Sequence, residues 1–162
     1  MPKLHQLTLA GVMLALTALP ALAEWYPHEA AGVSLYFPDH WLVEVSDDSM
    51  LAATTPDETV GVVVRVFEVA DLEAALGALE SELMSVVADF QPSGYYEDTL
   101  NGMPMVAGEG TGVIEGYPAE VALLVVLTPA DKALMVFGAG QQEFVAQYQA
   151  DLDTIFANIS PL

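Results

Sequence analysis

Residues 121–127 form an apolar run, VALLVVL, in which no polar side chain interrupts the pattern. A strand with one face in water alternates apolar and polar side chains, whereas a strand covered on both faces is apolar throughout. The run does not alternate, so this strand must lie between two covering layers. That requirement constrains the fold more than any other feature of the chain.

Two segments have the spacing of amphipathic helices and are the available covers. Apolar side chains recur at intervals of three and four between residues 72 and 89, and Asp71 before them is a suitable N-cap. A second such pattern runs from Phe144 to Phe156. Strand patterns occupy much of the remaining chain, at residues 32–37, 41–45, 50–54, 59–69, 95–100, 103–115, 119–127 and 133–137. This order predicts an α+β fold, a mainly antiparallel β-sheet covered by a helix on each face (an αβα sandwich).

Turn-forming residues mark the boundaries between these elements. Residues 91–94, QPSG, are predicted to end the first helix. Asn101 and Gly102 predict a tight hairpin turn, because both residues accept a positive φ. Three glycines at alternate positions of the next strand predict a bulge or a close approach of another segment; they are Gly108, Gly110 and Gly112.

The first 23 residues have the pattern of a cleaved export signal. A positive start is followed by an uncharged apolar stretch over residues 7–19, and small residues stand at 21 and 23. The stretch is short for a membrane span. We therefore expect cleavage after Ala23, a single domain over residues 24–162, and a periplasmic or secreted protein without a stable membrane anchor.

The charge of the chain is strongly acidic and limits its partners. Removing residues 1–23 takes away Lys3 and none of the 23 acids, which leaves Arg65 and Lys132 and a net charge of −21. Such a surface repels nucleic acids and anionic membranes, and it leaves basic proteins and divalent cations as admissible partners. Solubility in a saline exterior is the alternative explanation. The chain has no cysteine, which excludes thiol catalysis and thiolate metal sites.

Residues 32–41, GVSLYFPDHW, resemble the strand-Pro-x-x-Trp opening of the PsbP-like superfamily. This fold is shared by the PsbP subunit of photosystem II, bacterial DcrB-like exported proteins and a nuclear Ran-binding import factor. The later helix, hairpin, apolar strands and final helix follow in the expected order, so the resemblance covers residues 32–162. It implies an αβα sandwich and a binding or assembly protein with no shared catalytic residues. The scarcity of Lys and Arg departs from PsbP itself, which docks through basic residues.

Several acidic residues in predicted loops are candidate metal ligands. Asp39 and His40 offer two adjacent ligands, and Asp47 and Asp48 lie in a loop that can meet the acids of residues 57–58 in space. Clustered carboxylates suit calcium, although no EF-hand register is present. Solvated loop charges, and a turn at Asp39, remain the alternatives. Met103 and Met105 offer a copper(I) spacing or a core-facing pair.

Candidate residues for a protein partner are a lone cation and several aromatic side chains. Arg65 lies in an apolar strand, so it forms either a structural ion pair or an anchor for an anionic group. The aromatic residues stand at strand ends or turns and form either a shared binding patch or separate edges of the core; they are Trp25, Tyr26, Tyr95, Tyr96 and Tyr117.

No catalytic set is evident in the sequence. No serine stands in a nucleophile elbow, and no His-x-x-x-His zinc pair is present. We therefore predict a non-enzymatic binding or assembly module that docks a protein partner and carries no cofactor. The alternatives are a calcium-binding protein and a hydrolase that uses carboxylates such as Glu97, Asp98 and Glu115 as general acid and base.

Overall fold

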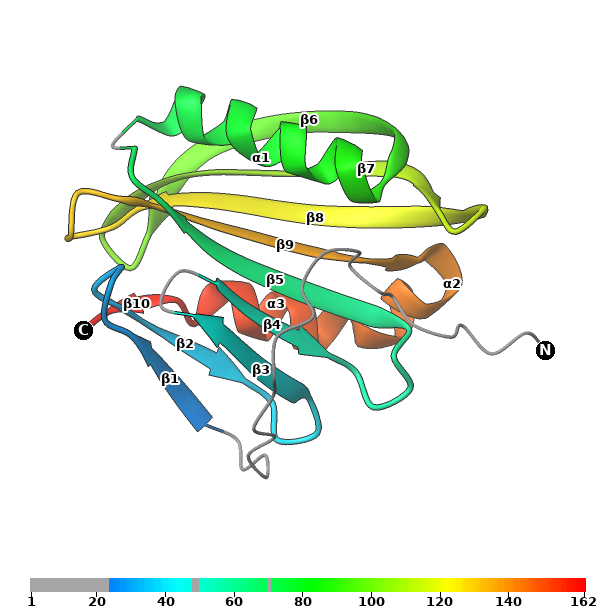
Figure 1. Ribbon diagram of the computed structural model, residues 1–162, viewed down its shortest axis with the longest axis horizontal. Helices are drawn as coiled ribbons and strands as arrows, with labels where there is room; N and C mark the ends of the chain where they lie inside the picture. Colours follow the sequence, from blue (N-terminus) through cyan, green and yellow to red (C-terminus); the bar gives the residue numbers. More distant parts are fainter. Residues whose placement is uncertain (1–23, 48–49, 70) are drawn as a thin grey trace.

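The computed structural model describes residues 24–47, 50–69 and 71–162. At its centre is a seven-stranded antiparallel sheet in the order β3-β4-β5-β9-β8-β7-β6 (Figure 1). The strands are β3 (Leu42–Asp47), β4 (Met50–Thr54), β5 (Val60–Phe67), β6 (Ala88–Leu100), β7 (Met103–Ile114), β8 (Tyr117–Leu127) and β9 (Ala133–Gln141). The predicted export signal lies outside the described residues.

Helix α1 (Leu72–Val86) covers one face of the sheet. Its N-terminus is capped as the sequence predicts, because the Asp71 carboxylate accepts a hydrogen bond of 2.7 Å from the backbone N–H of Ala74. The buried side of the helix packs against alternate residues of the central strands, among them Leu123 and Met135. The helix ends earlier than residue 89, the end predicted from its apolar stripe, because residues 88–94 already belong to β6.

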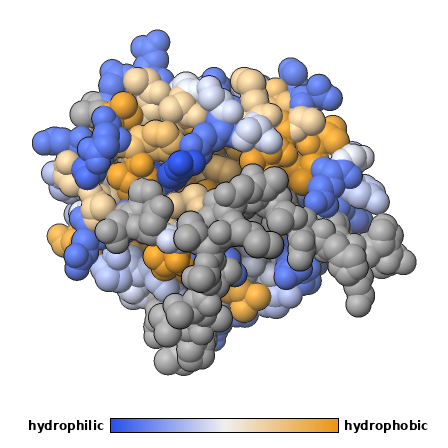
Figure 2. Space-filling view, viewed as in Figure 1, coloured by the Kyte–Doolittle hydropathy of each residue, from blue (hydrophilic) through white to orange (hydrophobic). Residues whose placement is uncertain are grey.

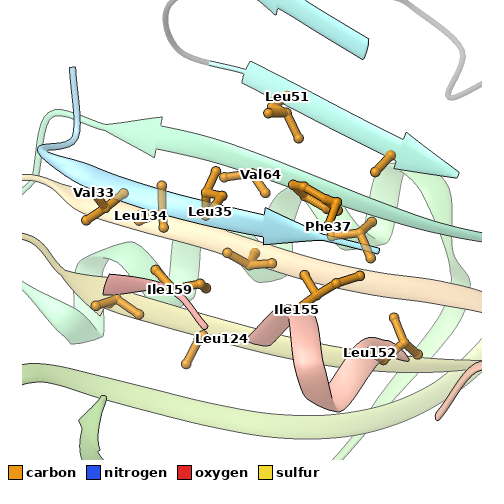
Figure 3. Packing of buried hydrophobic residues seen from close by; sticks show 14 of the residues in the cluster. Val33, Leu35, Phe37, Leu51, Val64, Leu124, Leu134, Leu152, Ile155 and Ile159 are labelled. Atoms are coloured by element: carbon orange, nitrogen blue, oxygen red, sulfur yellow. The ribbon is translucent and has the colours of Figure 1, made fainter. Parts of the chain in front are cut away.

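The opposite face is covered by a helix and a small sheet together. Helix α3 (Gln149–Ala157) follows the short α2 (Gln142–Val145) and the 3₁₀ turn η1 (Ala146–Tyr148), so the second predicted helix is divided. Beside it, β2 (Val33–Phe37) pairs with β1 (Glu24–His28) and β10 (Ser160–Pro161) in a three-stranded sheet. Figure 3 shows side chains of β2 and α3 packed against the sheet; they include Leu35, Phe37, Leu152 and Ile155.

This arrangement confirms the α+β sandwich and adds a small sheet to the second cover. Both faces of β8 are covered, since Val125 packs under α1 while Leu124 and Val126 pack under the second layer. The second cover is not a helix alone, because the strand predicted at residues 32–37 leaves the main sheet and lies across its face. Strand β2 can do this because its alternating side chains Val33, Leu35 and Phe37 are all buried on one side.

The β6–β7 hairpin has the tight turn predicted at Asn101 and Gly102, with φ of 50° and 85°. The glycines of β7 allow close contacts with β6. A Cβ at Gly108 would stand 2.4 Å from a ring carbon of Tyr95, so this position has room only for glycine. None of the helices in the described part of the chain has the length and hydropathy of a membrane span.

Candidate functional site

A groove lies on the second face, between α3 and the outer strands β6–β8. Its volume is about 550 Å³. The floor is apolar and comes from β7 and β8, with Met105, Ala107 and Leu124 buried or nearly so. Tyr96 of β6 forms one wall, and Phe156 of α3 forms the other. The groove is therefore bounded by the consecutive strands β6–β8 and by α3, which lies further along the sequence.

One end of the groove is fixed by a tether between the β6–β7 turn and the end of α3. The side-chain amide of Asn101 donates hydrogen bonds to the backbone carbonyls of Ala157, at 3.2 Å, and Ile159, at 2.7 Å. At the other end lie Ser93 and Gly94, where the pairing of β6 with β7 is irregular. The tether joins the C-terminal end of α3 to the turn that follows β6.

The alternation of strand β6 places its two adjacent tyrosines on opposite faces. Tyr95 lies over Gly108 on the α1 face, where its hydroxyl donates a hydrogen bond to Glu80. Burial, and then the neighbouring Glu80 carboxylate, raise the pKa of Tyr95 above its ordinary value. Tyr96 points to the groove face and is 60% exposed. Tyr95 is thus a structural residue, whereas Tyr96 is available to a ligand.

Carboxylates surround the apolar floor. Glu109 and Asp153 line the groove and are exposed, and the Asp153 carboxylate accepts a hydrogen bond of 2.8 Å from the Gln149 side chain. The strand register places Asp98 and Glu120 on the same face of the sheet. Asp98 pairs with Met105, and Glu120 stands four residues before Leu124, so each shares a face with a residue buried on the groove side. The groove is apolar inside and acidic at its rim.

The two cations of the described chain are paired elsewhere. Arg65 lies on the α1 face, where its guanidinium is 2.7 Å from Glu82 and 5.6 Å from the ring centre of Phe67. The Lys132 ammonium, in the β8–β9 turn, is 2.9 Å from Glu68. Figure 2 shows one face of the molecule, on which hydrophilic residues project around the outline and apolar residues lie between them. Across the described residues, no Lys or Arg lies beside the groove carboxylates.

The predicted pair Asp39 and His40 lies at a different site, beside the first turn of α3. The His40 ring is 3.4 Å from the Asp39 carboxylate and 2.6 Å from Asp151. The indole N–H of Trp41 donates to the same Asp151 oxygen over 3.0 Å. The bond to Asp151 holds the pKa of His40 above its ordinary value, against the opposing effect of partial burial. This cluster joins the β2–β3 loop to α3.

Of the loop acids proposed for calcium, the described residues Asp47 and Asp57 lie far apart. Asp47 ends β3 and Asp57 follows β4, so these residues lie at opposite ends of β4, separated by roughly 13 Å of strand. Asp48 lies outside the described residues. Asp57 instead accepts hydrogen bonds from Thr55, Thr59 and Tyr148. Burial raises the pKa of Asp57, but these hydrogen bonds outweigh it, and the pKa lies below its ordinary value.

No group of three or more His, Cys, Asp or Glu side chains that could hold a metal ion occurs among the described residues. Met103 and Met105 face the core, where both are buried. Their spacing therefore reflects the alternation of a strand with one covered face.

The carboxylates considered for hydrolysis are exposed and far apart. Glu97 and Asp98 lie on β6 opposite Val106 and Met105, whereas Glu115 lies in the turn after Ile114. Roughly 26 Å of strand separates the two places. A general acid and base that act on one bond must meet, so these three residues do not form a catalytic pair.

The aromatic residues do not form one patch. The ring centres of Trp25 and Tyr36 are 5.5 Å apart on the small sheet, with the rings tilted, whereas Tyr117 is the first residue of β8. Of the predicted aromatic residues, only Tyr96 lines the groove. The sequence reading missed Glu109, Asp153 and Phe156. The signal for Glu109 was present, because it continues the alternation of Met103, Met105 and Ala107 on the covered face of β7.

No family model matches the chain, and no curated protein sequence matches it. Several solved structures have the same fold. Cyanobacterial PsbP (CyanoP) from Synechocystis sp. PCC 6803 is 9% identical with a TM-score of 0.65, covering 94% of this chain and 99% of that chain. LpqN of Mycobacterium tuberculosis, involved in cell envelope biogenesis, is 18% identical with a TM-score of 0.61, covering 79% and 82%.

The Ran-binding protein Mog1p of Saccharomyces cerevisiae is 9% identical with a TM-score of 0.58, covering 86% of this chain and 95% of that chain. At these identities the likeness concerns the fold. It confirms, at the level of the fold, the resemblance to the PsbP-like superfamily that residues 32–41 indicate.

Proposed function

We propose that the protein is an exported, non-enzymatic binding or assembly module that docks a protein partner in the groove between α3 and strands β6–β8. The observation that carries this proposal is the groove itself, an open and mainly apolar groove beside α3 with a volume of about 550 Å³. Binding sites combine a mainly apolar surface with a few polar groups that set orientation. Met105, Leu124 and Phe156 supply the apolar surface, and the groove carboxylates supply the polar groups.

The chemistry of the lining favours binding over catalysis. Its two acidic side chains, Glu109 and Asp153, are both exposed. Catalytic acids and bases are desolvated or held against a charged partner that shifts their pKa. The names of the fold relatives support an interaction module, since Mog1p is a Ran-binding protein and LpqN is involved in cell envelope biogenesis.

A photo-crosslinking amino acid at Tyr96, introduced in the native host, tests this function. The matched control carries it at Met84, which is 62% exposed on the outer side of α1. We expect a discrete adduct with one protein from the Tyr96 position and none from Met84. Excess purified wild-type chain should compete the adduct away. The same adducts from both positions, or no adduct from Tyr96, would contradict docking in the groove.

Export is tested separately. Cell fractionation and the mass of the purified protein should give a chain that begins at Glu24 outside the cytoplasm. Full-length protein retained in the cytoplasm would contradict export and leave the groove assignment to the crosslinking result.

A further inference from the structure

We infer that the occupant of the groove is a short protein segment in which lysine or arginine side chains flank an apolar side chain. This inference rests on the proposed function, since it assigns the chemistry of the docked partner. It depends on two features of the groove, the apolar floor of Met105, Ala107 and Leu124 and the acidic rim.

The rim carries charge from three strands and a helix. Glu109 and Asp153 line the groove, and Asp98 and Glu120 lie on the same face of the sheet by register. Arg65 and Lys132 are engaged with Glu82 and Glu68 in other parts of the described structure. The rim therefore creates a negative potential that no neighbouring cation of the described chain offsets.

This potential discriminates between possible occupants. An acidic segment would meet like charges around the floor, which costs binding free energy and rejects it. A neutral apolar segment would cover the floor and partly dehydrate the carboxylates without giving them a partner. A segment with cationic side chains beside an apolar anchor fills the floor and pairs with the rim at once.

The dimensions of the groove suit a short segment. Along β6 it extends from Gly94 to Leu100, roughly 20 Å at the rise of a strand. About six extended residues cover this length. The Asn101 tether borders one end, so the segment leaves the groove at the Ser93 end.

Three synthetic hexapeptides, titrated into residues 24–162 labelled with ¹⁵N, test this inference by NMR. They alternate leucine with lysine, with serine or with glutamate. We expect the lysine–leucine peptide to shift the amide signals of Tyr96, Ala107 and Phe156 in a saturable way. The serine and glutamate peptides should bind at least roughly fivefold more weakly, because they form no rim pairs.

Two variants with equal changes of charge separate the rim from the general acidity of the chain. The rim variant carries Glu109→Gln and Asp153→Asn. The control variant carries Glu73→Gln and Glu97→Gln, which remove two exposed acids of α1 and of the α1 face of β6. The rim variant should bind the lysine–leucine peptide roughly 5- to 10-fold more weakly, and the control should bind it like wild type.

Each result has a defined meaning. Equal weakening in both variants, or shifts spread over the whole surface, would show attraction to net charge alone and overturn the inference. Equal binding of the serine–leucine peptide in the groove would also overturn it, while the docking function would stand. If the lysine–leucine peptide fails and crosslinks from Tyr96 persist, only the partner chemistry is wrong. If both fail, the docking function falls as well.

Discussion

The indole nitrogen of Trp41 donates a hydrogen bond to Asp151 over 3.0 Å, although 110 residues separate the two. Trp41 is fully buried, and Asp151 stands in the first turn of α3. The bond fixes the helix that completes the second cover of the sheet. It gives a physical reason for the strand-Pro-x-x-Trp pattern, because the Trp at its end anchors a distant helix.

Replacing Asp151 by alanine should destabilise the protein, because the buried indole N–H of Trp41 would lose its acceptor. The expected loss in the free energy of unfolding is about 1–3 kcal/mol, measured by urea denaturation. Asp153→Ala, two residues further along the same helix, removes an exposed carboxylate and should change stability by less than about 0.5 kcal/mol. Equal losses in the two variants would contradict an anchoring role for Asp151.

The stability that His40 contributes should depend on pH. Its pKa is raised by the bond to Asp151, so the contribution is complete below the unfolded pKa of about 6.5 and disappears as the pH rises through the folded pKa. Wild type should therefore exceed His40→Gln most clearly at about pH 5.5 and least above about pH 8. Because the side chain is nearly half exposed, the difference should be about 0.2–1 kcal/mol. Urea titrations at each pH would reveal it, and a gap that widens with rising pH would exclude this ion pair.

Gly108 should not tolerate a side chain. Alanine there would bring its Cβ to 2.4 Å from Tyr95 and 2.6 Å from the Gly94 carbonyl, so we expect a loss of about 1–3 kcal/mol. Gly77 is the matched control, because it lies in α1 with no atom within 4 Å of the added Cβ. Gly77→Ala should raise stability by roughly 0.5–1 kcal/mol. Thermal denaturation of both variants measures these changes in stability. If both variants were stabilised, or both destabilised, the prediction would be wrong.

Arg65 should behave as a structural residue through its pair with Glu82. A double-mutant cycle with Arg65→Met and Glu82→Gln should give a coupling energy of about 0.2–1 kcal/mol, reduced by 0.5 M salt. The modest size follows from partial exposure of both side chains. If Arg65→Met leaves stability unchanged and the coupling is zero, the alternative of an anchor for an anionic ligand regains support.

The sequence was sufficient for the central layer of the fold. The run at residues 121–127 predicts a strand covered on both faces, and Asp71, Asn101 and Gly102 predict a helix start and a tight turn that the structure confirms. These features depend on local backbone preferences and on burial, both of which leave periodic patterns in a sequence.

The ends of elements and the second cover were harder to predict. Val87 and Phe90 are buried and continue the apolar stripe of α1 in the sequence, yet the helix ends before them and β6 begins at Ala88. So short a segment fits the spacing of a helix and that of a strand equally well. Residues 91–94 read as a turn since β6 is an edge strand with mostly exposed side chains. Strand β2 alternates as any half-buried strand does, so its pattern does not reveal which sheet it joins.

The groove was not predictable from local patterns. It lies between the outer strands and α3, whose residues from Gln149 to Ala157 line it along the helix. Its charged residues come from β7 and α3, which meet only in the folded chain. Periodicity reports that a face of a strand is covered, but it does not report how far the cover extends.

The small sheet joins distant parts of the chain, because β2 pairs with β1 on one side and with Ser160 and Pro161 on the other. Residues 33–34 can therefore acquire this neighbour only after residues 160–161 have been synthesised. Pairing across such a sequence separation is a slow step in folding. Until it occurs, this edge of β2 has unpaired backbone N–H and C=O groups, and such an edge can pair with another chain.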